Sequence, residues 1–232
     1  MTNKYVDFIS DEDFLECVRS VCESYPEPSE EIDMEDLQKN VIDPFKMTFD
    51  IYSNNIKIED WKKLEKTRQK DKNINNKIGE FHQKILGRVD GWTDLGTGDN
   101  SRVDLRKNDY SIFIELKNKH NTMNSDATNE CRSKLKNALQ EHPDSIAYWG
   151  LIVPSNGKAE EIIWVKNGER IDNLKKATGE KVYEIVTGNS ENLKKVWLAL
   201  PKAIAYIKNQ DLSLTEEQQK ELLEFYKYAF KR

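Results

Sequence analysis

The chain has 232 residues, 33% of them charged, and a formal net charge of −5. This length allows one large domain or two small ones with a substantial core. No apolar run approaches the ~18 residues of a membrane helix, and the N-terminus lacks the apolar core of a signal peptide, so we expect a cytoplasmic protein with no membrane partner. An odd number of cysteines without paired metal-ligand spacing argues against a disulfide framework.

The charge is distributed unevenly along the chain. Residues 1–56 hold 4 Lys/Arg and 14 Asp/Glu, whereas residues 57–232 hold 32 and 27. We therefore expect an acidic, mainly helical N-terminal region (1–56) packed on a larger domain (57–232). That region fits a cap, a dimer element or a regulatory arm. Residues 57–88 contain 10 basic and 5 acidic residues. Such a run fits either DNA contact or an ordinary solvated helix face, so the overall charge does not exclude DNA.

The first half of the chain is predicted to be mostly helical. Ser10 and the acids after it predict a helix over residues 10–22. A second helix should include Met34–Val41, with Phe45–Tyr52 as a connection. Residues 58–72 and 73–87 each have helical patterns. In the latter, Ile74, Ile78, Phe81 and Ile85 form an apolar stripe.

A glycine-rich loop over residues 87–100 leads into the most informative stretch, residues 101–120. The loop lacks the Gly-Lys-Ser/Thr ending of a P-loop, which argues against nucleotide binding. Tyr110–Lys117 has the β-branched and aromatic density of a strand, with Phe113, Glu115 and Lys117 on one face. The turn chemistry of Lys107-Asn108-Asp109 predicts a hairpin that brings Asp104 back towards Glu115 and Lys117.

The second half alternates helices and strands. A helix capped by Ser125 or Asp126 should present Cys131, Leu135 and Ala138 inward, with Asn129, Arg132 and Lys136 facing elsewhere. Residues 146–153 predict a central strand, apolar on both faces. Further expected elements are strands at residues 161–165 and 181–186 and helices at residues 192–207 and 215–230.

Two carboxylates and a lysine together indicate metal-dependent phosphodiester chemistry. Asp104 and Glu115 suit Mg²⁺, which prefers one or two acids plus a phosphate, with Mn²⁺ expected to substitute. Lys117 would position the attacking water or neutralise charge on phosphorus. Glu80 fits either an ordinary surface acid or a third carboxylate reaching the metal. The alternative for Asp104, Glu115 and Lys117 is an ordinary surface ion pair at an exposed strand end, without catalysis.

Val103-Asp104, ten residues, then Glu115-Leu116-Lys117 resembles the signature of the PD-(D/E)xK nucleases, with Val103 where a proline is often written. The resemblance covers residues 74–154. It implies an α/β fold, namely a restriction-endonuclease-like αβββαβ core with a mixed central sheet flanked by helices. By the resemblance, Asp104 and Glu115 would be metal ligands and Lys117 the catalytic lysine. Glu80, from its place on the preceding helix, is a further candidate catalytic acid.

Among these nucleases, the chain looks most like type II restriction endonucleases, and the Ile114–Thr122 run is most similar to the subgroup that cuts GG-N-CC or GG-W-CC sites. The resemblance implies a homodimer acting on double-stranded DNA beside a cognate DNA methyltransferase. A structure-specific repair or recombination nuclease and a non-catalytic DNA- or protein-binding module remain alternatives. Candidate DNA-binding residues are Asn118, Lys119, Asn121, Asn124, Asn129 and Arg132, because such side chains can pair with base edges.

Overall fold

The computed structural model describes residues 3–25, 37, 41–96, 103–120, 123–210 and 214–230, and these residues include a six-stranded mixed sheet. The strands are β1 (Trp92–Asp94), β2 (Leu105–Lys107), β3 (Ile112–Lys119), β4 (Ile146–Val153), β5 (Glu161–Ile163) and β6 (Leu174–Thr178). The helices are α1 (Asp11–Cys22), α3 (Pro44–Asn54), α4 (Ile58–Gly87), α5 (Ser125–Glu141), α6 (Glu180–Thr187), α7 (Asn192–Lys208) and α8 (Glu216–Phe230). No helix in these ranges is both long and apolar enough to cross a membrane. The structure therefore confirms a mixed α/β fold with helices at the N-terminal end.

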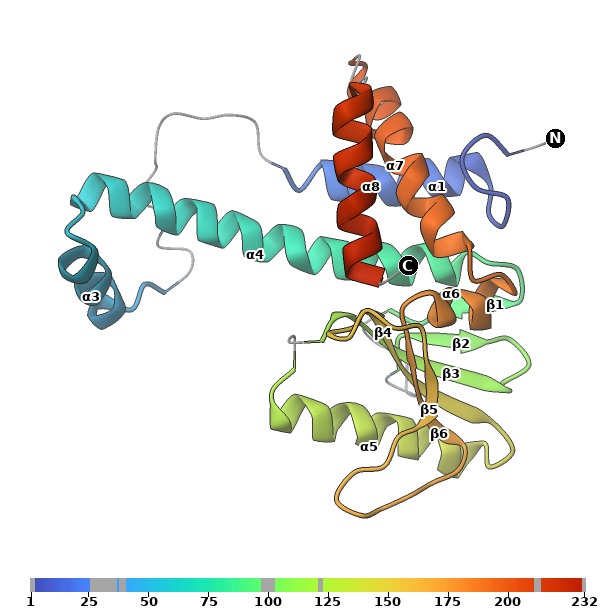
Figure 1. Cartoon of the computed structure of the whole chain (residues 1–232). Coiled ribbons are helices and arrows are strands. Elements are labelled where there is room, and N and C mark those ends of the chain that lie inside the picture. The colour runs from blue at the N-terminus through green and yellow to red at the C-terminus, as the bar shows by residue number, and fades with distance from the viewer. Residues whose placement is uncertain are drawn as a thin grey trace. The chain divides into compact units, whose positions relative to one another are not determined.

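The strand order in the sheet is β1-β2-β3-β4-β6-β5 (Figure 1). The pairs β1–β2, β2–β3 and β5–β6 are antiparallel, whereas β3–β4 and β4–β6 are parallel. The predicted hairpin is confirmed, because Leu105 pairs with Ile114 and Arg106 with Phe113. The predicted central strand over residues 146–153 is confirmed as β4.

Helices cover both faces of the sheet: α5 lies on one face and α6 on the other (Figure 1). Phe113 of β3 belongs to the core beneath α5, which is made of Val103, Cys131, Leu135, Ala138, Leu139, Ala147, Trp164 and Leu174. On the opposite face a Cβ added to Gly150 would meet Ile114, Leu116 and Val182. The period of two along β3 therefore works as predicted, and Glu115 and Lys117 share the α5 face with Phe113.

The chain divides into two compact units, one of residues 1–19 and 79–232, the other of residues 20–78. In the first unit, Ser10 caps α1 as predicted by accepting a hydrogen bond from the Asp13 amide at 3.1 Å. Arg88 forms ion pairs with Asp13 and Glu16, and Lys195 pairs with Asp7. These contacts neutralise part of the acidic charge near the N-terminus. The expected boundary at residues 56 and 57 falls inside the second unit.

The second unit contains a helix that the sequence analysis missed. Residues 45–52, expected as a connection, belong to α3, where Asp43 caps the N-terminus and Pro44 occupies the first turn. This helix has no buried residue, and Phe45, Phe49 and Tyr52 are exposed. The helix expected over residues 34–41 lies almost wholly outside the described residues.

Three other predicted elements differ from the structure. Residues 58–72 and 73–87 form one continuous helix, α4. The strand expected at residues 181–186 is wrong, since these residues form α6, in which Val182, Tyr183 and Val186 are buried at helical spacing. Strands β1 and β6 were not predicted from the sequence. The helices expected at residues 125–140, 192–207 and 215–230 are confirmed as α5, α7 and α8.

Substituting alanine for each of two glycines of α4 should change the stability of the protein in opposite directions. A Cβ on Gly87 would collide with the Cβ of Asp94 and lie 2.8 Å from its backbone nitrogen, whereas a Cβ on Gly79 meets nothing within 4 Å. We expect Gly87→Ala to lower the free energy of unfolding by about 1–3 kcal/mol through overpacking. Gly79→Ala should raise it by about 1 kcal/mol through helix propensity. Urea denaturation measures both, and equal effects of the two substitutions would contradict this close approach of α4 to β1.

Candidate active site

The β2–β3 hairpin fixes Asp104 through its backbone on both sides. Its amide donates to the Ile114 carbonyl at 3.1 Å, and its carbonyl accepts from the Leu95 amide at 3.0 Å. Its carboxylate oxygen Oδ2 accepts a hydrogen bond from the Leu116 amide at 2.7 Å. Asp104 is thus tied to the strand that carries the other two predicted site residues.

Glu115 and Lys117 lie beside Asp104. The Lys117 Nζ atom is 2.8 Å from Glu115 Oε1 and 3.8 Å from Asp104 Oδ2. The Glu115 side chain is only 2% exposed, whereas those of Lys117 and Asp104 are 28% and 22% exposed. The structure therefore brings the three residues together as the hairpin predicted.

A second lysine, which the sequence analysis missed, completes the group. Lys134 of α5 places its Nζ atom 3.2 Å from Glu115 Oε1. It lies one turn after Cys131, at the margin of the inward stripe of the helix, and this position was the available signal. We call Asp104, Glu115, Lys117 and Lys134 the charged cluster.

The electrostatics of the charged cluster reflect its burial. Burial, and then the charge of Glu115, raise the pKa of Asp104 to about 6, although Lys117 and the Leu116 amide act in the opposite direction. Burial alone would lower the pKa of Lys117, but the charges of Asp104 and Glu115 outweigh it and raise that pKa above its ordinary value. The neighbouring Cys131 thiol is buried, and its pKa is raised to about 12, so this cysteine is an inert core residue.

One oxygen of the cluster is conspicuously unsatisfied. Glu115 Oε2 is buried and has no hydrogen-bond partner among the residues that the structure describes. A buried carboxylate oxygen without a partner is costly, and a hard cation is a ligand that would satisfy it. In the described ranges no three His, Cys, Asp or Glu side chains form a metal-holding group. The carboxylates that the described ranges place around Lys117 are those of Asp104 and Glu115, and both could contribute oxygens to a cation.

The helix that precedes the hairpin carries Glu80, the third expected acid, and also Gln83, which was not predicted. The Glu80 carboxylate is 3.9 Å from Lys84 on its own helix, and its side chain is 45% exposed. Gln83, about one turn later, donates to Asp94 Oδ1 at 2.6 Å and to the Asp104 carbonyl at 3.5 Å. Gln83 therefore links α4 to both strands that flank the site, and a role for Glu80 remains a prediction.

The predicted DNA-binding residues occupy different environments. Asn118 is half-buried and Lys119 exposed at the end of β3, directly after Lys117, while Asn121 lies outside the described residues. Asn124 accepts a hydrogen bond from the Ala127 amide as the N-cap of α5. Asn129 is exposed on α5, where its Oδ1 atom accepts from Lys166.

Arg132 does not face away from the core as expected. It is 5% exposed and donates to the Trp164 carbonyl at 2.6 Å and to the Glu169 carbonyl at 3.1 Å. It also pairs with the Glu169 carboxylate at 3.2 Å. These contacts give Arg132 a structural position between α5 and the segment that joins β5 to β6.

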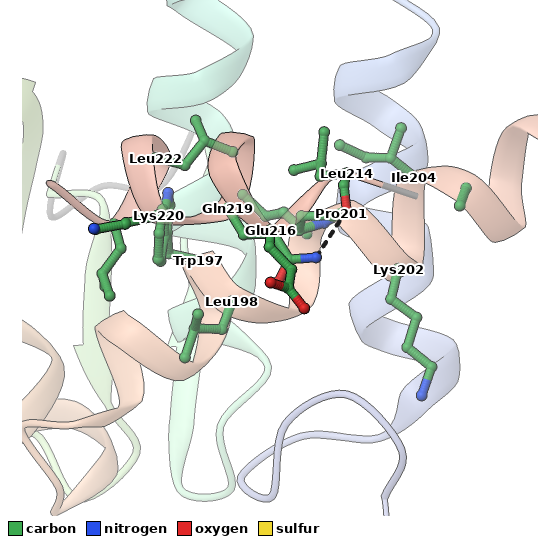
Figure 2. A pocket seen from close by; sticks show the side chains of 13 residues that line it. Trp197, Leu198, Pro201, Lys202, Ile204, Leu214, Glu216, Gln219, Lys220 and Leu222 are labelled. Carbon is green, nitrogen blue, oxygen red and sulfur yellow. Dashed lines mark hydrogen bonds between the residues drawn. The ribbon is translucent and has the colours of Figure 1, made fainter. Parts of the chain in front are cut away.

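An apolar groove of about 820 Å³ lies elsewhere, between α7 and α8. Figure 2 shows Trp197, Leu198 and Leu222 lining it, with Gln219 donating to the Leu214 carbonyl at 2.9 Å. No residue of the charged cluster lines this groove. The charged cluster and this apolar groove are thus separate features.

The raised pKa of Asp104 gives a test of the site in the metal-free protein. A carboxyl whose folded pKa exceeds its unfolded value contributes stability below the unfolded pKa and loses it as the pH rises through the folded pKa. Here that window runs from the ordinary value of 3.8 to about 6. Asp104→Asn removes the penalty at high pH, so its stability relative to wild type should be about 2 kcal/mol more favourable at pH 8 than at pH 4.5. Urea denaturation in a chelator at both pH values measures this, and an equal effect at both would show that Asp104 is not a destabilised carboxylate.

Comparison with known proteins agrees with this geometry. Residues 6–208 match the family model described as Eco47II restriction endonuclease. The chain is 36% identical over 216 residues to the type II restriction enzyme Sau96I of Staphylococcus aureus, covering 88% of this chain and 81% of that protein. It is 31% identical over 224 residues to the type II restriction enzyme Eco47II of Escherichia coli, covering 89% and 90%. The chain therefore belongs to the Eco47II restriction endonuclease family and is a type II restriction endonuclease, an enzyme that cleaves DNA at specific sites.

Proposed function

We propose that this endonuclease hydrolyses double-stranded DNA at the charged cluster in a Mg²⁺-dependent reaction, with Mn²⁺ as a substitute. The observation that carries the proposal is the buried Oε2 atom of Glu115, which lacks a hydrogen-bond partner in the described ranges, in a cluster that also contains the Asp104 carboxylate. Mg²⁺ typically binds one or two protein carboxylates, several waters and a substrate phosphate, which matches two acids without a third. Asp104 and Glu115 would hold the ion.

When bound, Mg²⁺ supplies polarisation of the phosphodiester and lowers the pKa of water. The chain's own groups would do the remaining work. Lys117, 2.8 Å from Glu115, would direct the attacking water and offset negative charge that develops on the phosphate oxygens. The backbone bond from the Leu116 amide would hold Asp104 in a fixed orientation during the reaction.

We also assign the run α4-β1-β2-β3-α5-β4 to the αβββαβ core of the PD-(D/E)xK nucleases. Its support is the element order and the antiparallel hairpin followed by a parallel β3–β4 pair. In this assignment α4 is the first core helix and α5 the second. The acidic N-terminal region then precedes the core, and it would serve as a cap, a dimer element or a regulatory arm.

We also propose a substrate and partners on the basis of the family. By its resemblance to the subgroup that cuts GG-N-CC or GG-W-CC sites, the enzyme would recognise a short palindrome of that kind. A palindrome suits a homodimer in which each protomer cuts one strand. A cognate DNA methyltransferase in the cytoplasm would protect the host's own sites.

We propose that residues that follow the charged cluster along the chain contact the DNA bases. Asn118 and Lys119 extend β3 immediately beyond Lys117, so they would meet DNA bound at the site. Asn121 and Asn129 remain candidates beside them. Arg132 is a weaker one, because the Trp164 and Glu169 carbonyls and the Glu169 carboxylate already occupy its donors.

Activity of variants tests the cluster. Glu115→Gln and Lys117→Met should each slow plasmid cleavage in Mg²⁺ by about 100- to 1,000-fold, because each removes an electrostatic contribution to the transition state. Asp109→Asn changes an exposed acid in the turn of the same hairpin and should cut like wild type. Gel assays of linear and nicked product measure the rates. Full activity of Glu115→Gln would place the chemistry elsewhere in the chain.

Sequencing the ends of digested plasmid tests the recognition site. We expect every end to fall within one short palindromic sequence of the GG-N-CC or GG-W-CC kind. The substitution Lys119→Ala should weaken cutting or relax one position of the site, since a lost base contact costs about 1–3 kcal/mol. Ends scattered over unrelated sequences would contradict the assigned site.

A further inference from the structure

Lys134 holds a position that the cleavage chemistry described above does not require. It comes from α5, whereas the other three residues of the charged cluster come from the hairpin. Its Nζ atom is 3.2 Å from Glu115 Oε1, and its side chain is 26% exposed. Glu115 Oε1 therefore lies next to two ammonium groups, at 2.8 Å and 3.2 Å, while Oε2 has no hydrogen-bond partner in the described part of the chain.

The charged cluster contains as many lysines as acids. Two carboxylates and two ammonium groups leave no formal excess of negative charge with which to attract a divalent cation. A cation that approaches Glu115 without DNA meets the repulsion of both ammonium groups, in surroundings where charges act strongly on each other. A DNA phosphate brings a negative charge to the same place and shifts the balance towards the metal.

Lys134 also has a second acid within reach. Its Nζ atom is 3.7 Å from Glu130 Oε1, one turn earlier on α5, and the Glu130 side chain is 72% exposed. Lys117 lacks such an alternative in its own strand, since its two acid partners are Asp104 and Glu115 themselves. Lys134 can therefore release Glu115 and keep an ionic partner.

We propose that Lys134 is a positioning residue that holds Glu115 in place before DNA arrives and weakens divalent-cation binding by the DNA-free enzyme. Metal and DNA then bind cooperatively, which limits loading of the metal away from a substrate. This inference rests on the proposed function in one respect, namely that Asp104 and Glu115 hold the metal. It goes beyond that function by giving the second lysine a role in when the metal binds.

Calorimetric titration of the full-length protein with Ca²⁺, without DNA, tests the proposal. Lys134→Met removes the charge but keeps a long apolar side chain, so the variant should bind Ca²⁺ about tenfold more tightly than wild type. Lys134→Arg keeps the charge and should bind Ca²⁺ like wild type. Lys136→Met is the matched control, because Lys136 is on the same helix but pairs with Glu169 at 2.7 Å. It should leave the affinity unchanged.

The cooperativity supplies a second readout. Fluorescence anisotropy with a duplex of the cleaved sequence should show that Ca²⁺ tightens DNA binding by wild type more than by Lys134→Met, since coupling between two ligands is reciprocal. Should Lys134→Met fail to fold, as judged by circular dichroism, Lys134→Gln removes the charge while still offering a donor to Glu115. The same gain in Ca²⁺ affinity is expected of it.

The outcomes separate this inference from the proposed function. Ca²⁺ affinity of the charge-removing variants equal to or weaker than that of wild type would overturn the role of Lys134. If Glu115→Gln abolishes Ca²⁺ binding in that case, the metal site itself stands. If Glu115→Gln binds Ca²⁺ as wild type does, with and without DNA, the assignment of the metal to Glu115 fails and the inference fails with it.

Discussion

Burying a carboxylate is expensive unless cations or hydrogen-bond donors stand next to it, and the site of this enzyme is built around one such group. Glu115 is almost inaccessible, yet only one of its two oxygens finds hydrogen-bond partners within the described residues. Those partners come from two elements, the strand that carries Glu115 and the helix that covers it. The packing of α5 on the sheet, which also builds the apolar core around Phe113 and Leu135, therefore sets the electrostatics of the site.

Apolar packing and polar chemistry share one face of β3. Phe113 anchors the strand in the core, and two residues later the same face carries Glu115. The antiparallel pairing with β2 then places Asp104 opposite, where the Leu116 amide holds its carboxylate. A shift of one residue in this pairing would send Glu115 and Lys117 to the α6 face, so the register of a short hairpin decides whether the cluster exists.

The parts of this site that the sequence could predict are those governed by local geometry. Alternation along a strand put Glu115 and Lys117 on one face, and turn chemistry brought Asp104 back to them. Lys134 and Gln83 were not predicted, because their contacts depend on how α5 and α4 are rotated against the sheet. No local sequence pattern encodes this rotation. The same limit applies to β6. Its lysines contact Glu161 and the Trp149 ring on neighbouring strands, and these contacts depend on the tertiary arrangement. The error at residues 181–186 has another cause. Its Val, Tyr and Ile content favours strands, but burial at Val182, Tyr183 and Val186 follows a helical spacing.

The position of Arg132 affects how mutations that abolish cleavage by this enzyme should be interpreted. Its guanidinium is a buried clamp on the backbone carbonyls of Trp164 and Glu169, and it lies over the Trp164 ring at 5.3 Å. Truncating it would remove this donor from the Trp164 carbonyl, would leave the Glu169 carbonyl with the Lys166 amide alone, and would loosen the segment that joins β5 to β6. A screen that scores only lost cleavage would then count a folding defect as a recognition defect. The melting temperature of each inactive variant distinguishes a residue that contacts bases from one that stabilises the fold.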